Sequence, residues 1–304
     1  MKELKKNAPT APRIVKAMAS AGQVLIDQKQ VYRDPFGEPV KLEAPPSLTI
    51  EQKQIVSRIQ ESMGETFAPF LLVGITGSGK TEVYIRLALE TINRGLSVII
   101  LVPEIALISQ MERRFRSRFG NQIAILHSGL TPGERYDQWL KLARGEINIA
   151  IGARSAIFAP VKNIGLIVVD EEHDASYKQE SALRYNARDL ALVRAKQHRA
   201  VALLGSATPS IQSYHNALSG KYTQVKLTKR IMERSLPDIT IVDLSSLRNQ
   251  RGFRRYFSKE LLLELKNTLQ RNEQAILFLN RRGFASLQIC GSCGKPLQCK
   301  NCDI

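Results

Sequence analysis

Residues 74–81 read Gly-Ile-Thr-Gly-Ser-Gly-Lys-Thr, which fits the phosphate-binding pattern G-x-x-x-x-G-K-[ST]. The apolar run 70–73 before them predicts a buried strand, and residues 81–90 have the spacing of an amphipathic helix. A loop that joins a strand to a helix N-terminus directs backbone N–H groups at an anion. This order predicts an α/β fold that binds a nucleoside triphosphate, and the alternative is a chance glycine-rich turn.

Each part of this loop has an expected role. The glycines let backbone N–H groups turn toward phosphate oxygens. Lys80 is expected to reach the β- and γ-phosphates of ATP, and the Thr81 hydroxyl to bind Mg²⁺. The predicted nucleotide-binding residues of the loop are Gly74, Ile75, Thr76, Gly77, Ser78, Gly79, Lys80 and Thr81.

Strand and helix patterns alternate from Leu48 onward. Polar or amphipathic stretches separate short apolar runs at residues 70–73, 98–102, 123–126, 147–151, 164–169 and 201–204. Such alternation predicts a parallel sheet with helices on both faces.

Four polar residues follow the hydrophobic strand predicted at 166–169, namely Asp170, Glu171, Glu172 and His173. The first of them is expected at the carboxyl end of the strand, where ligands bind in open α/β sheets. There Asp170 can hold Mg²⁺ opposite Thr81, and Glu171 can orient and deprotonate an attacking water. Acidic clusters after strands also arise by chance, so this prediction depends on the phosphate loop. The predicted catalytic set is Lys80, Asp170, Glu171, Glu172 and His173.

The charge balance favours a polyanionic partner. The 304 residues include 44 Lys+Arg and 28 Asp+Glu, a formal net charge of +16. A basic surface kept only for solubility is the alternative. The sequence has no run of about 18 apolar residues, so we expect no membrane span. The first residues lack a signal-peptide pattern, and we therefore expect a cytoplasmic enzyme.

Several segments resemble motifs of the superfamily 2 helicases. Gly205-Ser-Ala-Thr-Pro-Ser210 resembles the motif that links hydrolysis to strand separation, which implies coupling roles for Ser206 and Thr208. Residues 48–52 resemble the upstream motif whose glutamine, here Gln52, reads adenine; a helix N-cap at Thr49 is an alternative compatible with it. Further resemblance to the motifs that bracket the DNA backbone occurs at 102–105 and 127–131.

Residues 152–160, Gly-Ala-Arg-Ser-Ala-Ile-Phe-Ala-Pro, resemble the signature of the primosomal protein N′ (PriA) family of replication-restart helicases. The likeness extends over essentially the whole chain, including residues 174–180, 184–189 and 279–285. It implies a RecA-like ATPase lobe of a 3′→5′ DNA helicase that acts in primosome assembly at stalled forks and D-loops. The implied partners are single-stranded and forked DNA, primosome proteins and single-stranded-DNA-binding protein.

The resemblance also identifies residues 174–189 as an aromatic-rich loop that senses single-stranded DNA. Base stacking by its tyrosines and phosphate contacts by its cations are compatible with this role. The alternative is that the tyrosines pack against the lobe. For Arg154, a phosphate contact competes with a surface ion pair. The predicted DNA-binding and coupling residues are Arg154, Tyr177, Lys178, Arg184, Tyr185, Arg188, Ser206 and Thr208.

The predicted domains are an N-terminal remnant with linker (1–47) that resembles the end of the family's winged-helix domain, the ATP-binding lobe (48–235), the linker and start of a second lobe (236–289), and part of a zinc region (290–304). The first contains a short helix at 13–21 and a small hairpin over 22–32, and the third a helix at 258–272 and a buried strand at 274–279. The resemblance implies truncation at both ends and an absent arginine finger, so we expect slow ATP turnover. A phosphate-loop kinase and a non-catalytic DNA- or partner-binding fragment remain alternatives.

Two C-x-x-C pairs occupy the last fifteen residues and predict zinc ligands, namely Cys290, Cys293, Cys299 and Cys302. Five residues separate the pairs, a short distance for closing one site. In the resembling family each pair belongs to a different zinc that later cysteines complete. We therefore expect weak zinc binding and poor order over 288–304, although one site with four thiolates stays open.

Overall fold

The computed structural model describes residues 8, 10–26, 31–181, 183–230, 238–245 and 257–278. It divides the chain into two units, Met1–Arg234 and Ser235–Ile304. The four cysteines lie outside the described residues, so the zinc prediction stays a prediction. None of the helices within the described ranges is long and apolar enough to cross a membrane.

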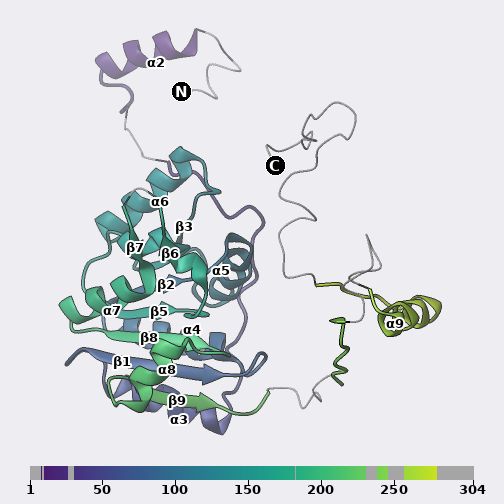
Figure 1. The fold of residues 1–304 in the computed structure, drawn as a ribbon. Coiled ribbons are helices and arrows are strands. Elements are labelled where there is room, and N and C mark those ends of the chain that lie inside the picture. Colours follow the sequence, from purple (N-terminus) through teal and green to yellow (C-terminus); the bar gives the residue numbers. More distant parts are fainter. Residues whose placement is uncertain are drawn as a thin grey trace. The chain divides into compact units, whose positions relative to one another are not determined.

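A parallel sheet of seven strands forms the centre of the first unit (Figure 1), and it confirms the predicted α/β class. The strand order is β3-β4-β2-β5-β8-β1-β9. The strands are β1 (Ala68–Gly74), β2 (Ser97–Leu101), β3 (Ile123–Leu126), β4 (Ile149–Gly152), β5 (Ile164–Val169), β8 (Val201–Ser206) and β9 (Thr223–Leu227). Six of them match predicted apolar runs. The strand β9 was not predicted; it is an edge strand whose mixed polar and apolar residues pair with β1.

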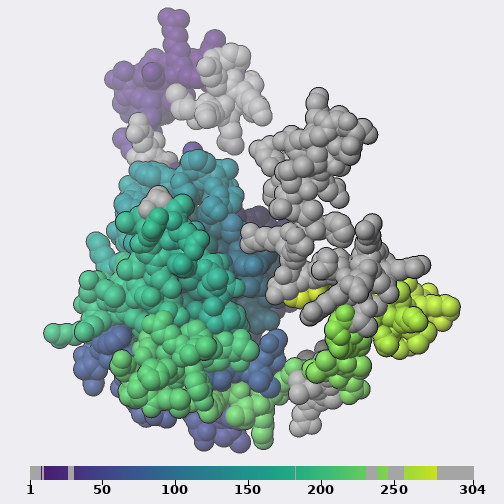
Figure 2. Space-filling view, viewed as in Figure 1, coloured from purple at the N-terminus to yellow at the C-terminus, as the bar shows by residue number. Residues whose placement is uncertain are grey.

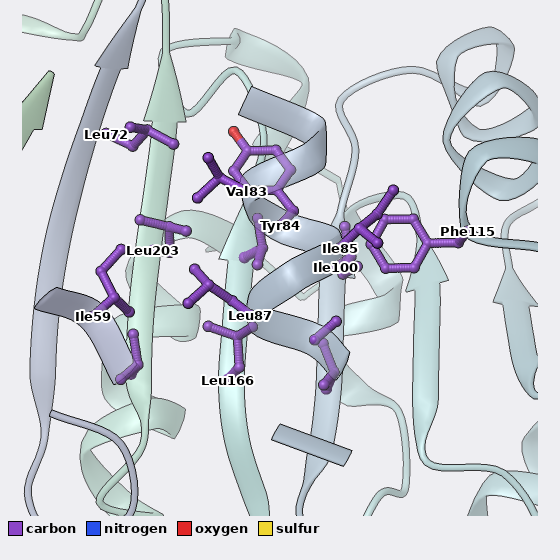
Figure 3. Close-up of a cluster of buried hydrophobic side chains, with 14 of the residues drawn as sticks. Ile59, Leu72, Val83, Tyr84, Ile85, Leu87, Ile100, Phe115, Leu166 and Leu203 are labelled. Carbon is purple, nitrogen blue, oxygen red and sulfur yellow. The ribbon is translucent and has the colours of Figure 1, made fainter. Parts of the chain in front are cut away.

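Helices cover both faces of this sheet because successive strand residues point to opposite sides. Leu72 packs with the helices of one face and its neighbour Leu71 with those of the other. The first face is covered by α3 (Ile50–Gln60), α4 (Lys80–Asn93) and α5 (Ile105–Phe119) (Figure 3). The second face packs against α6 (Pro132–Arg144), the 3₁₀-helix η1 (Arg154–Phe158) and α7 (Ala187–Gln197).

Local capping residues set where α3 and α6 begin. The Thr49 hydroxyl accepts from the Gln52 backbone N–H, while the Gln52 side chain accepts from Thr49, which completes a capping box. Thr131 and Glu134 form the same arrangement at α6. The helix cap weighed for Thr49 is therefore present.

Residues 31–47 belong to the first unit and pack against its helices. The backbone N–H and Nη1 of Arg33 donate to Asp137 Oδ2 at 3.0 and 2.8 Å. The Phe36 ring lies against the core, 4.5 Å from the Arg116 guanidinium carbon. Contacts of this kind join the segment to α5 and α6. In the space-filling view the spheres of residues 48–181 and 183–230 form one continuous body (Figure 2).

The chain termini differ from expectation in two places. The predicted helix near residue 13 is present as α2 (Ala11–Ser20), but no strand forms over the described residues 22–26, 31 and 32. In the second unit, α9 (Lys259–Gln270) is present, capped by Ser258. The strand predicted at 274–279 is absent over the described residues 274–278, and Ile276 is 95% exposed. An apolar run becomes a strand only beside a partner strand, and the described part of this unit supplies none.

Candidate active site

The phosphate loop joins β1 to α4 and lines a cavity of about 420 Å³ together with Asp170 and Glu171. Gly77 and Gly79 have φ values of 83° and 84°, a left-handed conformation that favours glycine. Gly79 immediately precedes α4, so the first turn of that helix faces the cavity. The chain brings its predicted phosphate-binding and metal-binding residues together at this point.

Two features of the loop suit a phosphate-bearing ligand. A Cβ on Gly74 would lie 2.6 Å from Ser78 Oγ, so only glycine leaves this cradle open. The buried Ser78 Oγ has no hydrogen-bond partner among the described residues. Buried polar atoms are normally paired. A phosphate oxygen bound here is suited to fill that role.

Lys80 points from the start of α4 toward the carboxyl edge of the sheet. Its Nζ donates to the Gly74 carbonyl oxygen at 2.9 Å and lies 3.2 Å from Glu171 Oε1. Only about a tenth of the side chain is exposed. The Gly74 carbonyl oxygen and the Glu171 carboxylate thus hold the Lys80 ammonium inside the cavity.

Asp170 follows β5 directly, as predicted. Its Oδ1 accepts a hydrogen bond of 3.0 Å from the Tyr84 hydroxyl. Burial, followed by the adjacent Glu171 charge, raises the pKa of Asp170 above its ordinary value. Ionising this carboxylate is therefore costly at its buried position, and a divalent cation bound beside it would offset that cost.

Glu171 has a left-handed backbone, with φ 44°, which is unusual for a residue other than glycine. This turn directs its carboxylate into the cavity toward Lys80. The next residue, Glu172, therefore points elsewhere. Strained backbone of this kind persists where the surroundings hold it, and it concentrates at functional sites.

Glu172 corrects the predicted catalytic set. Its side chain is fully buried and does not line the nucleotide cavity. Its two oxygens accept from the Ser210 N–H and hydroxyl, the Ser213 hydroxyl and Arg188 Nη1 at 2.7, 3.0, 2.8 and 3.3 Å. Glu172 therefore joins the end of β5 to the start of α8 (Ile211–Leu218), as a positioning residue.

His173 joins the acidic segment to β8. Its Nδ1 lies 2.8 Å from Ser206 Oγ and 3.7 Å from Glu171 Oε2. Ser206 Oγ also accepts from the Thr208 N–H at 2.9 Å. The predicted residues of these two motifs thus form one chain of contacts leading away from the cavity.

Gln52 is buried against the phosphate loop. Its amide nitrogen lies 3.4 and 3.3 Å from the carbonyl oxygens of Ser78 and Gly79. The side chain thus contacts both the N-cap of α3 and the phosphate loop, and it connects the helix to the loop. Adenine recognition by Gln52 stays a prediction.

The structure corrects two of the predicted DNA contacts. Tyr177 is 1% exposed, and its hydroxyl lies 2.6 Å from the Asp170 carbonyl oxygen, so the ring cannot stack on a base. This is the packing alternative that the sequence left open. Arg188 is paired with Glu172 and Asp189, and only 11% of its side chain is exposed. Both residues stabilise the lobe.

The remaining predicted contacts are partly or fully exposed. Arg154 Nη1 donates to the carbonyl oxygens of Ser176 and Lys178, and Arg154 has no ion pair within the described ranges, so its contact with a phosphate stays a prediction. Lys178 and Arg184 are exposed at a short hairpin: Lys178 begins β6 (Lys178–Gln179), and Arg184 directly precedes β7 (Tyr185–Asn186). The half-buried Tyr185 ring packs edge-on against the Phe158 ring, with the two ring centroids 5.1 Å apart.

Tyr84 was not predicted as a site residue, yet its hydroxyl positions the predicted Mg²⁺ ligand Asp170. It is fully buried, and Figure 3 shows its hydroxyl oxygen at the end where the strand arrowheads lie. A Cβ on Gly205 would lie only 1.8 Å from that oxygen, so the glycine makes room for the tyrosine. The helical spacing of Tyr84 signalled only a core residue, and nothing local revealed its partners.

Known proteins resemble this chain in sequence. The DEAD/DEAH box helicase family model matches residues 49–217. The chain is 44% identical over 305 residues to the replication restart protein PriA of Bacillus subtilis (strain 168), covering 99% of this chain and 38% of that protein. The PriA of Synechocystis sp. is 41% identical to this chain, and the match covers 99% of this chain and 37% of that protein. The structure of RecG bound to a three-way DNA junction has 28% identity and a TM-score of 0.49, covering 64% of this chain and 27% of RecG.

Proposed function

Because this chain belongs to the DEAD/DEAH box helicase family, we propose that it binds ATP·Mg²⁺ at residues 74–81 and couples hydrolysis to 3′→5′ movement on DNA during replication restart. The chain spans a little over a third of the length of the curated relatives it matches, so their whole activity is part of this proposal. One observation carries it: Lys80, Asp170 and Glu171 meet in a single cavity at the carboxyl edge of the sheet.

Four residues of the cavity have proposed tasks. Thr81 and Asp170 would hold Mg²⁺, which when bound neutralises phosphate charge. Lys80 exchanges its contacts with Gly74 and Glu171 for the β- and γ-phosphates. Glu171, released from that ion pair, orients the attacking water and accepts its proton.

The contacts of His173 support a proposed path from hydrolysis to DNA. A change at Glu171 alters the position of His173, which is bonded to Ser206 and, through it, to Thr208. Lys178 and Arg184 are the proposed phosphate contacts that remain exposed.

Zinc, primosome proteins and single-stranded-DNA-binding protein are also proposed as ligand and partners. The support for zinc is the two C-x-x-C pairs alone. The support for the protein partners is the likeness to relatives named replication restart proteins.

Replacing Lys80 with alanine is expected to reduce ATP affinity by about 2–4 kcal/mol, because a charge-assisted contact to phosphate is lost. Calorimetric titration with ATP·Mg²⁺ measures the change. Lys53→Ala is a suitable control, since this exposed lysine on α3 does not line the cavity. Equal affinity in Lys80→Ala and the wild type would remove the nucleotide assignment.

Single-stranded DNA is expected to stimulate ATP hydrolysis by this chain. The stimulation should weaken steeply with added salt, because the counterions released on binding contribute less to DNA affinity at high salt. Steady-state phosphate release with and without oligothymidylate measures it. DNA binding with no turnover would favour the non-catalytic fragment, and turnover indifferent to DNA would favour another phosphate-loop enzyme.

A further inference from the structure

A groove of about 500 Å³ lies between α6 and η1, well away from the phosphate loop. Three aromatic side chains line it and remain exposed: Tyr136 (59%), Trp139 (46%) and Phe158 (52%). Large aromatic side chains usually lose most of their exposure on folding. Three exposed aromatic side chains at one open groove indicate a site that binds a ligand or partner.

The sequence of α6 makes this face unusual. Pro132, Arg135, Tyr136 and Trp139 have the i, i+3, i+4, i+7 spacing of a helix stripe that normally faces a core. The helix instead buries Asp137, Gln138 and Leu142, and of these Leu142 lies at the edge of the stripe, seven residues after Arg135. The aromatic stripe is therefore left without a partner in the described part of the chain.

The charges around the groove suit an anion. Arg135 is the charged residue that lines it, and its guanidinium has no hydrogen bond or ion pair within the described ranges. The two nearby acids on α6 are occupied: Glu134 accepts from Thr131, and Asp137 accepts from Arg33. An apolar, aromatic floor with a cation at its side matches a base joined to a phosphate.

The groove opens at the same edge of the sheet as the nucleotide cavity. Leu126 ends β3, and Ser155 and Phe158 follow β4, so these lining residues lie at the carboxyl ends of parallel strands. Four strands separate β3 from β1, and at about 4.8 Å per strand the groove lies roughly 24 Å from the phosphate loop. Changes in the groove should therefore leave nucleotide binding intact.

Phe158 connects the groove to the proposed phosphate contacts. Its ring meets Tyr185 edge-on, and Tyr185 lines a second hollow with Lys178 and Arg184. This ring contact places the aromatic groove next to the hollow that holds Lys178 and Arg184, so one extended DNA strand can contact both.

We propose that this groove is a stacking platform for the bases of single-stranded DNA, formed by Trp139 and Tyr136, with Arg135 contacting the backbone phosphate. Every base has a flat face, so stacking on aromatic side chains binds single strands with little sequence preference. The inference rests on the proposed DNA-dependent function and adds a binding site to it. A protein segment anchored by apolar side chains is the competing occupant.

Trp139 is the chain's single tryptophan, so its fluorescence reports on the groove alone. Unlabelled oligothymidylate is expected to quench that fluorescence over the concentration range in which a separately labelled oligothymidylate shows binding by anisotropy. Trp139→Ala should lower affinity about 5- to 150-fold, the factor for one lost base stack. Trp139→Phe, which keeps a stacking ring, should bind within a few-fold of the wild type. Arg135→Ala should make the salt dependence shallower by about 0.7 in slope.

Tyr214→Ala is the matched control, because this exposed tyrosine on α8 lies outside the groove. It should bind DNA as the wild type does, and thermal melting shows whether each variant folds. DNA binding without quenching, with wild-type affinity in Trp139→Ala, overturns the stacking platform, leaves the proposed function in place and points to a protein occupant. Absence of any DNA binding by the wild-type chain overturns both proposals.

Discussion

A chain with Glu171→Gln is expected to hydrolyse ATP about 10²- to 10⁴-fold more slowly than the wild type, with ATP affinity within a few-fold. Glutamine keeps the size and hydrogen bonding of the side chain but cannot accept the proton of the attacking water. The ion pair with Lys80 is lost as well. The lysine then reaches phosphate without first leaving a carboxylate, so nucleotide binding should survive the change.

Single-turnover hydrolysis at saturating ATP separates this loss from any change in binding. Glu65→Gln provides a matched control, because this glutamate is exposed and lies outside the cavity. If Glu171→Gln hydrolyses ATP at the wild-type rate while the control does too, a different residue is the base.

A second large effect is expected one residue later, on stability. Glu172→Ala removes a buried carboxylate and leaves Arg188, Ser210 and Ser213 without their common acceptor. Breaking a buried pair from one side costs about 3–5 kcal/mol. For a domain of this size that corresponds to a fall of roughly 6–20 °C in melting temperature.

Thermal unfolding followed by circular dichroism measures this shift. Glu180→Ala is the comparison, since its ion pair with Lys178 is exposed and such pairs contribute only about 0–1 kcal/mol. An unchanged melting temperature in Glu172→Ala, together with lost hydrolysis, would restore the catalytic role that the sequence suggested for Glu172.

The sequence alone determined the phosphate loop, the parallel order of strands and helices, and the position of Asp170 at a strand end. These features depend on short-range patterns. Glycines at a turn, alternating apolar runs and a helix cap act within a few residues, so they can be read before the chain folds. For the same reason the helices α2 and α9 were found near their predicted ends.

Only the tertiary structure decided what each side chain meets. Glu171 and Glu172 are adjacent, yet a left-handed turn sends one to Lys80 and the other to α8. Tyr177 resembled a DNA contact and is buried, whereas Trp139 lies on a stripe with core spacing and is exposed. Partners far apart in the sequence come together only when the sheet forms, and burial then sets whether a charge or ring supports the lobe or remains free to bind.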